Sequence, residues 1–234
     1  MSIAIVLKFL GITGIVAVVL FALSLFVLWT QISRYRHYWE ENNLKPAVAG
    51  EILYVALGDS TAQGIGATQP DKGYPGLIRQ QLMERKSKPV RLVNLSKSGA
   101  KVRDVIETQL PALQALNTDD QTIITIEIGA NNMVNFDAQQ FESDMNELMS
   151  QLPPQTIISD IPYFGGSRFK SKEPNVIRAN EIMYRLADKH GFELVPLHDQ
   201  IQRNGGFKTF APDWFHPSNT AYRENWAPVF LERL

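Results

Sequence analysis

The fold of this chain is decided by the stretch Ile52-Leu53-Tyr54-Val55-Ala56-Leu57-Gly58-Asp59-Ser60. Its first six residues form a continuous apolar run, which is typical of a strand buried on both faces of a parallel sheet. Gly58 then turns the chain, and Ser60 presents a hydroxyl directly after the strand. Ligands of open α/β sheets bind at the carboxyl ends of the strands. Ser60 is therefore a candidate nucleophile, which would need a base to activate it.

Four more apolar runs follow, and segments with helical periodicity separate them. The predicted strands are Ile52–Leu57, Val90–Leu95, Thr122–Ile128, Thr156–Ile161 and Glu193–Leu197. The predicted helices are Tyr74–Arg85, Val102–Leu116 with a possible kink at Pro111, Ala138–Leu152, Pro174–His190 and Asn219–Leu234. This alternation predicts a three-layer α/β/α sandwich around a parallel sheet of five strands.

The N-terminal stretch is set apart because it lacks charge. From Phe9 to Thr30 there are 22 residues without a charged side chain, and such a helix crosses a hydrocarbon core of about 30 Å. A cleaved signal peptide is the alternative, but its apolar core has only about 7–15 residues. We therefore expect a transmembrane anchor over residues 1–33, a juxtamembrane linker over 34–50 and one globular domain over 51–234.

Charge and composition limit the partners and cofactors. Lys8 and the terminal amine on one flank nearly balance Arg34 and Arg36 on the other, so the side of the membrane that carries the domain stays open. The formal net charge is -1, and nucleic acid is therefore not an expected partner. The chain has no cysteine, and its four histidines lack metal-ligand spacing. We expect no metal and no cofactor, and the oligomeric state stays open.

Four polar segments stand at or near the predicted strand ends: Gly58 to Ser60, Asn94 to Gly99, Gly129 to Asn132, and Asp213 to His216. Histidine is the side chain whose ordinary pKa lies near neutrality, so His216 can take the Ser60 proton and later return it. Asp213, three residues earlier, can fix the imidazole tautomer and stabilise the imidazolium.

These segments resemble the sequence blocks of the GDSL-type, or SGNH, hydrolases, named for serine, glycine, asparagine and histidine. The matching residues are Ser60, Gly99, Asn131 and His216, with Asp213 at the place of the family's aspartate. The resemblance covers about Ile52 to Ser218. It implies a catalytic triad of Ser60, Asp213 and His216, and an oxyanion hole made by Ser60, Gly99 and Asn131. Positions 58–62 lack the Gly-x-Ser-x-Gly elbow, which favours a flavodoxin-like sandwich over the α/β-hydrolase fold.

The resemblance implies a serine ester hydrolase that acts through an acyl-enzyme on ester or thioester bonds. Members of the family act on lipid acyl chains, lysophospholipids or acetylated carbohydrates, so the small-molecule or lipid substrate stays open, although a membrane anchor favours substrates near a membrane. An acyltransferase that uses the same serine and a non-catalytic ligand-binding domain remain alternatives.

Several neighbouring residues carry weaker expectations. Asn132 and Ser96 depart from the family pattern, which usually has aspartate and glycine at these places. Asp59 is expected to accept hydrogen bonds in the turn. Pro162–Gly166 is interpreted either as a substrate wall or as a plain connection, and His198 lies near the same edge of the sheet.

Overall fold

A five-stranded parallel sheet forms the centre of the domain. The computed structural model describes residues 3–205 and 209–234, with side chains from Gly14 onward. The strands are β1 (Ile52–Gly58), β2 (Val90–Asn94), β3 (Ile123–Glu127), β4 (Thr156–Ser159) and β5 (Leu194–Val195). Their order is β2-β1-β3-β4-β5, and every pair is parallel. The order reverses between β1 and β3, and a sheet of this type forms its ligand crevice there.

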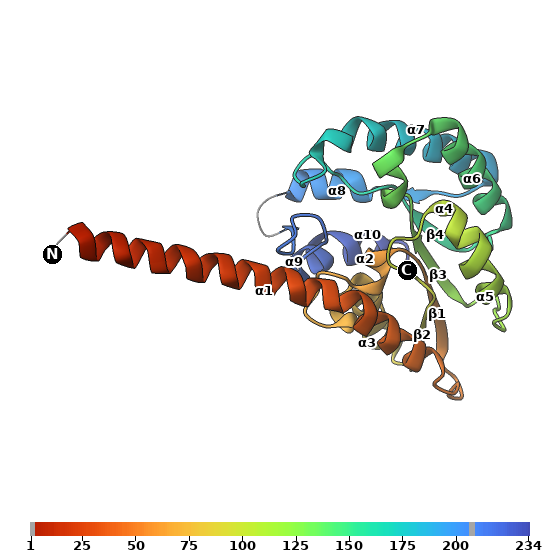
Figure 1. The fold of residues 1–234 in the computed structure, drawn as a ribbon. Helices are drawn as coiled ribbons and strands as arrows, with labels where there is room; N and C mark the ends of the chain where they lie inside the picture. The colour runs from red at the N-terminus through yellow and green to blue at the C-terminus, as the bar shows by residue number, and fades with distance from the viewer. Residues whose placement is uncertain (1–2, 206–208) are drawn as a thin grey trace.

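Helices cover both faces of the sheet (Figure 1). One face carries α4 (Val102–Asp104), η2 (Val105–Gln109), α5 (Leu110–Gln114), α6 (Ala138–Gln151) and α7 (Glu173–His190). The other carries part of α1 (Ile3–Asn43), then α3 (Tyr74–Lys86), α8 (Leu197–Asn204), α9 (Asn219–Ala221), η6 (Tyr222–Trp226) and α10 (Ala227–Leu231). The predicted three-layer α/β/α sandwich with flavodoxin-like strand order is confirmed.

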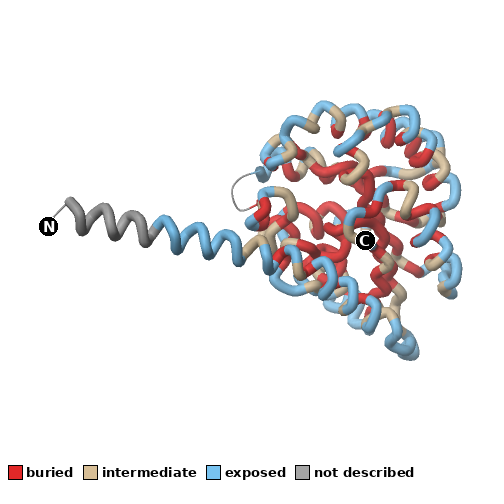
Figure 2. Tube along the Cα trace, viewed as in Figure 1, coloured by how far each residue is buried: buried red, intermediate tan, exposed pale blue. Residues whose placement is uncertain are grey.

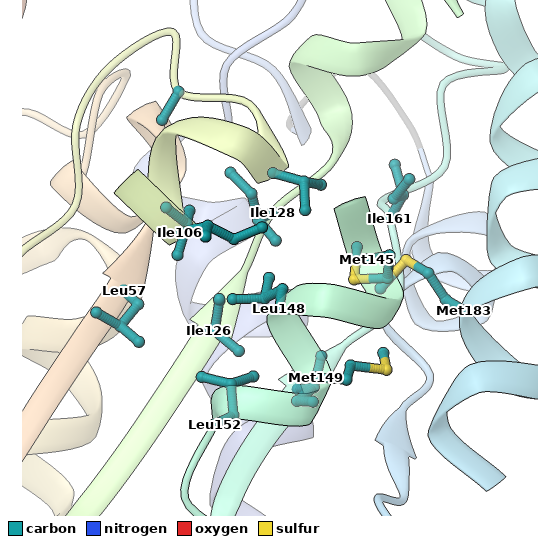
Figure 3. Packing of buried hydrophobic residues seen from close by; sticks show 14 of the residues in the cluster. Leu57, Ile106, Ile126, Ile128, Met145, Leu148, Met149, Leu152, Ile161 and Met183 are labelled. Atoms are coloured by element: carbon teal, nitrogen blue, oxygen red, sulfur yellow. The ribbon is translucent and has the colours of Figure 1, made fainter. Parts of the chain in front are cut away.

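Two apolar layers hold the sandwich together, and the buried residues gather at its centre (Figure 2). On one face, Leu57 and Ile126 of the sheet pack with Leu148 of α6 and Met183 of α7 (Figure 3). On the other, the Tyr74 ring stacks on Phe230 with centroids 5.0 Å apart. The strands are thus covered on both sides, as their continuous apolar sequences require.

Two of the predicted helices contain a wider turn. The π segment η2 ends at Gln109, two residues before Pro111, and the π segment η6 ends at Trp226, two residues before Pro228. Proline has no N–H and its ring clashes with the carbonyl four residues earlier, so the preceding turn opens to five-residue spacing. The backbone keeps right-handed helical dihedral angles at Leu110 and Ala227, next to the two prolines.

Helix α1 is longer than the predicted anchor. It runs without interruption from Ile3 to Asn43, so most of the segment expected to be a linker over 34–50 is helical. Figure 1 shows its N-terminal part projecting away from the domain and its C-terminal part lying along it. The part Gly14–Asn43 is long and apolar enough to cross a membrane by length and composition. The side chain of Lys8 lies outside the described residues.

One face of the C-terminal half of α1 is buried on the domain. Leu28, Gln31, Tyr35 and Trp39 recur every three or four residues along this face, and all four are buried. Gln31 Nε2 and the Tyr35 hydroxyl both donate to the carbonyl of Ala67, at 3.0 and 2.8 Å. Helix α1 is therefore part of the domain's packing.

Candidate active site

The turn after β1 is built around Gly58 and Asp59. Gly58 has φ +137°, and a Cβ there would lie 2.3 Å from the carbonyl oxygen of Glu127 on the neighbouring strand. Only glycine allows this approach, which brings the ends of β1 and β3 together. Asp59 is the N-cap of the short helix α2 (Ser60–Gln63), and its carboxylate accepts from the Thr61 N–H at 3.0 Å. The predicted acceptor role of Asp59 is confirmed.

Three of the predicted site residues form a continuous hydrogen-bonded chain. The Ser60 hydroxyl lies 3.1 Å from His216 Nε2, and His216 Nδ1 lies 2.7 Å from Asp213 Oδ2. An ionised carboxylate can only accept, so Nδ1 carries the proton and Nε2 is left to accept from Ser60. This is the tautomer that a general base for Ser60 requires.

The loop that carries His216 is shaped by Asp213 as well. The other carboxylate oxygen, Asp213 Oδ1, accepts from the backbone N–H groups of Phe215 and His216, both at 3.1 Å. Burial alone would raise the pKa of Asp213, but the hydrogen bonds from His216 and the backbone outweigh it, and the pKa is lowered. The carboxylate is therefore ionised and orients the imidazole at neutral pH.

The predicted oxyanion donors line the same cleft as Ser60 and His216. Within the described residues, neither the Ser60 N–H nor the Gly99 N–H donates a hydrogen bond to another protein atom. Gly99 has φ +81° with open space where a Cβ would stand, so its backbone conformation, more than close packing, favours glycine. Two unpartnered N–H groups next to a serine hydroxyl can bind a developing negative charge.

Asn131 is held at the wall of this cleft. Its Nδ2 donates to Asp59 Oδ2 and to the carbonyl of Ala100, both at 3.0 Å. An oxyanion in the cleft therefore has to share one of the two Nδ2 hydrogens with Asp59 or with the Ala100 carbonyl. The amide therefore has a fixed position and is not free to rotate.

A buried pair of carboxyl groups that the sequence pattern did not single out lies next to the turn that carries Ser60. Glu127, at the end of β3, contacts the Thr61 hydroxyl, and burial together with the nearby Asp59 raises its pKa to about 8. Burial also raises the pKa of Asp59. Asp59 accepts from Thr61 and Asn131, whereas Glu127 Oε1 has no partner among the described residues. Glu127 is therefore the member that keeps a proton at neutral pH.

Two connected hollows meet at Ser60. The open cleft, of about 260 Å³, contains Ser60, Gly99, Asn131 and His216. A smaller hollow of about 20 Å³ adjoins it, and its apolar lining is Pro162, Tyr163, Phe164, Ile201, Phe210, Phe215 and Trp226. Pro162, Tyr163 and Phe164 therefore form a wall beside Ser60, in agreement with one of the two interpretations of Pro162–Gly166.

His198 supports that wall from behind. Its Nε2 lies 2.7 Å from Glu173 Oε1, and the other Glu173 oxygen accepts from the Phe164 N–H at 2.6 Å. The His198 ring also meets Tyr163 edge-on, with centroids 5.4 Å apart. The hydrogen bond to Glu173 raises the pKa of His198. His198 lies outside the residues that line either hollow.

The two departures from the family pattern have local explanations. Asn132 Oδ1 accepts from the Val102 N–H at 3.2 Å, at the first residue of α4, which needs an acceptor but no charge. Ser96 is buried, and its N–H donates to Asn94 Oδ1 at 3.1 Å. Neither residue lies among those that line the two hollows.

A flavodoxin-like sheet that presents a serine, a histidine and an unoccupied pair of N–H groups at its switch point is characteristic of carboxylic ester hydrolases. The chain belongs to the GDSL-like lipase/acylhydrolase family, whose profile matches residues 56–224. No curated protein sequence matches the chain significantly.

Solved structures share this fold at low sequence identity. LAE5, an alpha/beta hydrolase enzyme from the metagenome of Lake Arreo, Spain, is 23% identical with a TM-score of 0.65, and the match covers 80% of this chain and 96% of that one. The acetylxylan esterase Axe2 from Geobacillus stearothermophilus is 19% identical with a TM-score of 0.62, over 78% and 93% of the two chains. TesA is 21% identical with a TM-score of 0.60, over 77% and 94%.

Proposed function

We propose that this protein hydrolyses ester or thioester bonds through an acyl-enzyme on Ser60. The observation that carries the proposal is the chain from Ser60 through His216 to Asp213, at 3.1 and 2.7 Å. His216 Nε2 takes the hydroxyl proton as Ser60 Oγ attacks the carbonyl carbon, and it returns the proton to the leaving alcohol or thiol. His216 then takes a proton from water, and the hydroxide that forms releases the acid from Ser60.

The oxyanion of each tetrahedral intermediate binds to the Ser60 and Gly99 N–H groups. Both lie at the same cleft and have no other protein partner within the described residues. Asn131 adds a third donor when one of its hydrogens is shared between Asp59 and the oxyanion. Each such donor is worth about 2.7–4 kcal/mol of transition-state stabilisation.

The two hollows divide the substrate into an acyl part and a leaving group. The smaller hollow is lined mainly by aromatic and aliphatic side chains, which suits an apolar acyl group. The open cleft is left for the alcohol side of the ester.

The same proposal includes a location at a membrane. The side chains of Ile15, Val18 and Leu23 on α1 are exposed on several faces of the helix, and the helix is long enough to span a bilayer. A helix that is apolar all round is stable in lipid and unfavourable in water.

The test uses the purified full chain with a p-nitrophenyl ester and a fluorophosphonate label. Ser60→Ala is expected to lose at least about 10⁴-fold in kcat and all labelling. Ser150→Ala, on the exposed surface of α6, serves as the matched control and keeps both. Hydrolysis by Ser60→Ala at the wild-type rate would refute the proposal. Product analysis with an added alcohol distinguishes hydrolysis from acyl transfer.

A further inference from the structure

The wall of the catalytic cleft includes a residue of α1. Ile32 lines the open cleft together with Ser60 and His216, although it precedes β1 by some twenty residues in the chain. Its side chain is 42% exposed. The helix that projects from the domain therefore also forms one border of the site.

The position of Ile32 along α1 fixes the distance between the cleft and a membrane that α1 would span. The uncharged run of the sequence continues to Ser33, so Ile32 lies within its last helical turn, two residues before Arg34. Contact with the domain begins even earlier, at the buried Leu28. If α1 spans a bilayer, the cleft therefore opens within one helical turn of the hydrocarbon boundary.

The domain cannot swing freely about the helix. The Gly66 N–H donates to Gln31 Oε1 at 2.9 Å, and Trp39 Nε1 donates to the carbonyl of Gln63 at 3.0 Å. Near the end of α1, Asn43 makes a double hydrogen bond with the backbone of Asn94 at 2.8 Å. These contacts extend over three turns of a continuous helix, so they fix the orientation of the cleft relative to the helix axis.

The rim of the cleft carries apolar, aromatic and basic side chains, the kinds of residue that contact membranes. Val134 is 50% exposed on the rim, and Trp214, beside the lining residue Phe215, is 53% exposed. Arg168 and Lys172 also line the cleft, and no acidic residue does so among the described residues that line it. Exposed tryptophan and basic side chains are the residues that favour the interface of an anionic bilayer.

We propose that Ile32, Val134, Trp214, Arg168 and Lys172 form a membrane-contact rim, and that the substrate is an anionic lipid ester delivered to Ser60 from the bilayer surface. The ester carbonyl of such a lipid lies at headgroup depth, the depth at which α1 holds the cleft. The two basic side chains then meet the phosphate of the leaving group. This inference rests on the proposed function for its chemistry, but its geometry can be tested separately.

The first experiment measures the depth of Trp214 in the full chain, reconstituted in nanodiscs of phosphatidylcholine and phosphatidylglycerol. A Trp29→Phe background removes the exposed anchor tryptophan, and Trp39 and Trp226 are buried. Brominated lipids are expected to quench most of the emission that Trp214→Phe removes. Gln114→Trp, added to the double variant, is the control. It lies on α5, on the side of the domain away from the N-terminal end of α1 (Figure 1), and is expected to keep its emission.

The second experiment compares lysophosphatidylglycerol with lysophosphatidylcholine in the same nanodiscs. The wild-type chain is expected to hydrolyse the anionic lipid about tenfold faster. Arg168→Gln with Lys172→Gln is expected to remove this preference, whereas Lys189→Gln, at the far end of α7, keeps it. Hydrolysis of a water-soluble p-nitrophenyl ester serves as the internal reference for each variant.

The outcomes separate this inference from the proposed function. Unquenched Trp214, or equal quenching of the Gln114→Trp control, overturns the membrane-contact rim. Equal rates on the two lysolipids overturn the anionic substrate. Either result leaves the proposed function intact if Ser60→Ala abolishes hydrolysis of the soluble ester. Full activity of Ser60→Ala on that ester would instead refute the proposed function, while the quenching result would still stand.

Discussion

The carbonyl oxygen of Pro217 lies so close to Gly66 that a Cβ on Gly66 would stand 2.4 Å from it. The same Cβ would stand 2.9 Å from the Cβ of His216. Gly66 also has φ +94°, and its N–H donates to Gln31 of α1. One glycine therefore connects helix α1 with the loop that carries His216.

We predict that Gly66→Ala lowers both stability and kcat, because the loop that holds His216 has to move. The matched control is Gly191→Ala, where φ is +78° but nothing lies within 4 Å of the new Cβ. The control is expected to show only the backbone cost of about 1–2 kcal/mol. Thermal unfolding and ester hydrolysis would be measured for both variants. An equal effect of the two substitutions would contradict the role of close packing at Gly66.

Asp213→Asn is expected to lower kcat by about 10⁴-fold with a small change in KM. The amide can present an N–H to His216 and so stabilise the wrong tautomer. It also removes the negative charge that stabilises the imidazolium. Steady-state kinetics would test this, with Asp199→Asn as a control on the exposed surface of α8. A loss of less than about tenfold would show that Asp213 does not orient the base.

Asn131→Ala and its neighbour Asn132→Ala are expected to separate catalysis from structure. Asn131 lies in the cleft and its loss should lower kcat by about 10²–10³-fold. Asn132 only accepts from the Val102 N–H, so its loss should lower stability by about 1 kcal/mol and leave kcat unchanged. Kinetics and thermal unfolding of both variants provide the check. A similar kcat for Asn131→Ala and the wild type would remove Asn131 from the oxyanion hole.

Glu127 is expected to make stability fall as the pH rises. Its pKa is raised from 4.5 to about 8 in the folded chain, so its contribution to stability is complete below pH 4.5 and is lost as the pH rises through 8. Asp160 and His198 shift in the same direction. The difference between the wild type and Glu127→Gln therefore isolates Glu127. Unfolding midpoints at pH 5 and 8.5 should differ less in the variant, and identical pH dependence would contradict a protonated Glu127.

The parts of this molecule that depend on local sequence could be predicted. The five strands are near-continuous apolar runs, and their predicted ends agree with the structure within about two residues. Ser60, Gly99, Asn131 and His216 each follow a recognisable turn or strand end, so their convergence follows from the topology of a parallel sheet. Roles for these residues in catalysis remain the subject of the experiments above.

Features that depend on tertiary contacts could not be predicted. In the sequence, Glu127 is one polar residue at the end of a strand. Only its burial next to Asp59 raises its pKa. The predicted strand Glu193–Leu197 extends one residue into helix α8, because Leu197 continues an apolar run, and the sequence pattern did not predict the rest of α8. The polar stretch Glu40 to Gly50 predicts a linker over 34–50, and the helix continues to Asn43 because its buried face meets the domain, which the sequence pattern does not show.

The burial of Trp39 has a practical consequence for preparing a soluble fragment. A fragment that begins at Gly50 would expose the apolar surface beneath Trp39 and would leave the Gly66 N–H and the carbonyls of Gln63 and Ala67 without their partners on α1. It would also lack Ile32, and with it part of the cleft. Truncation just before Leu28 keeps all of these contacts and removes most of the exposed apolar helix. The truncation that yields an authentic enzyme therefore lies within the apparent anchor.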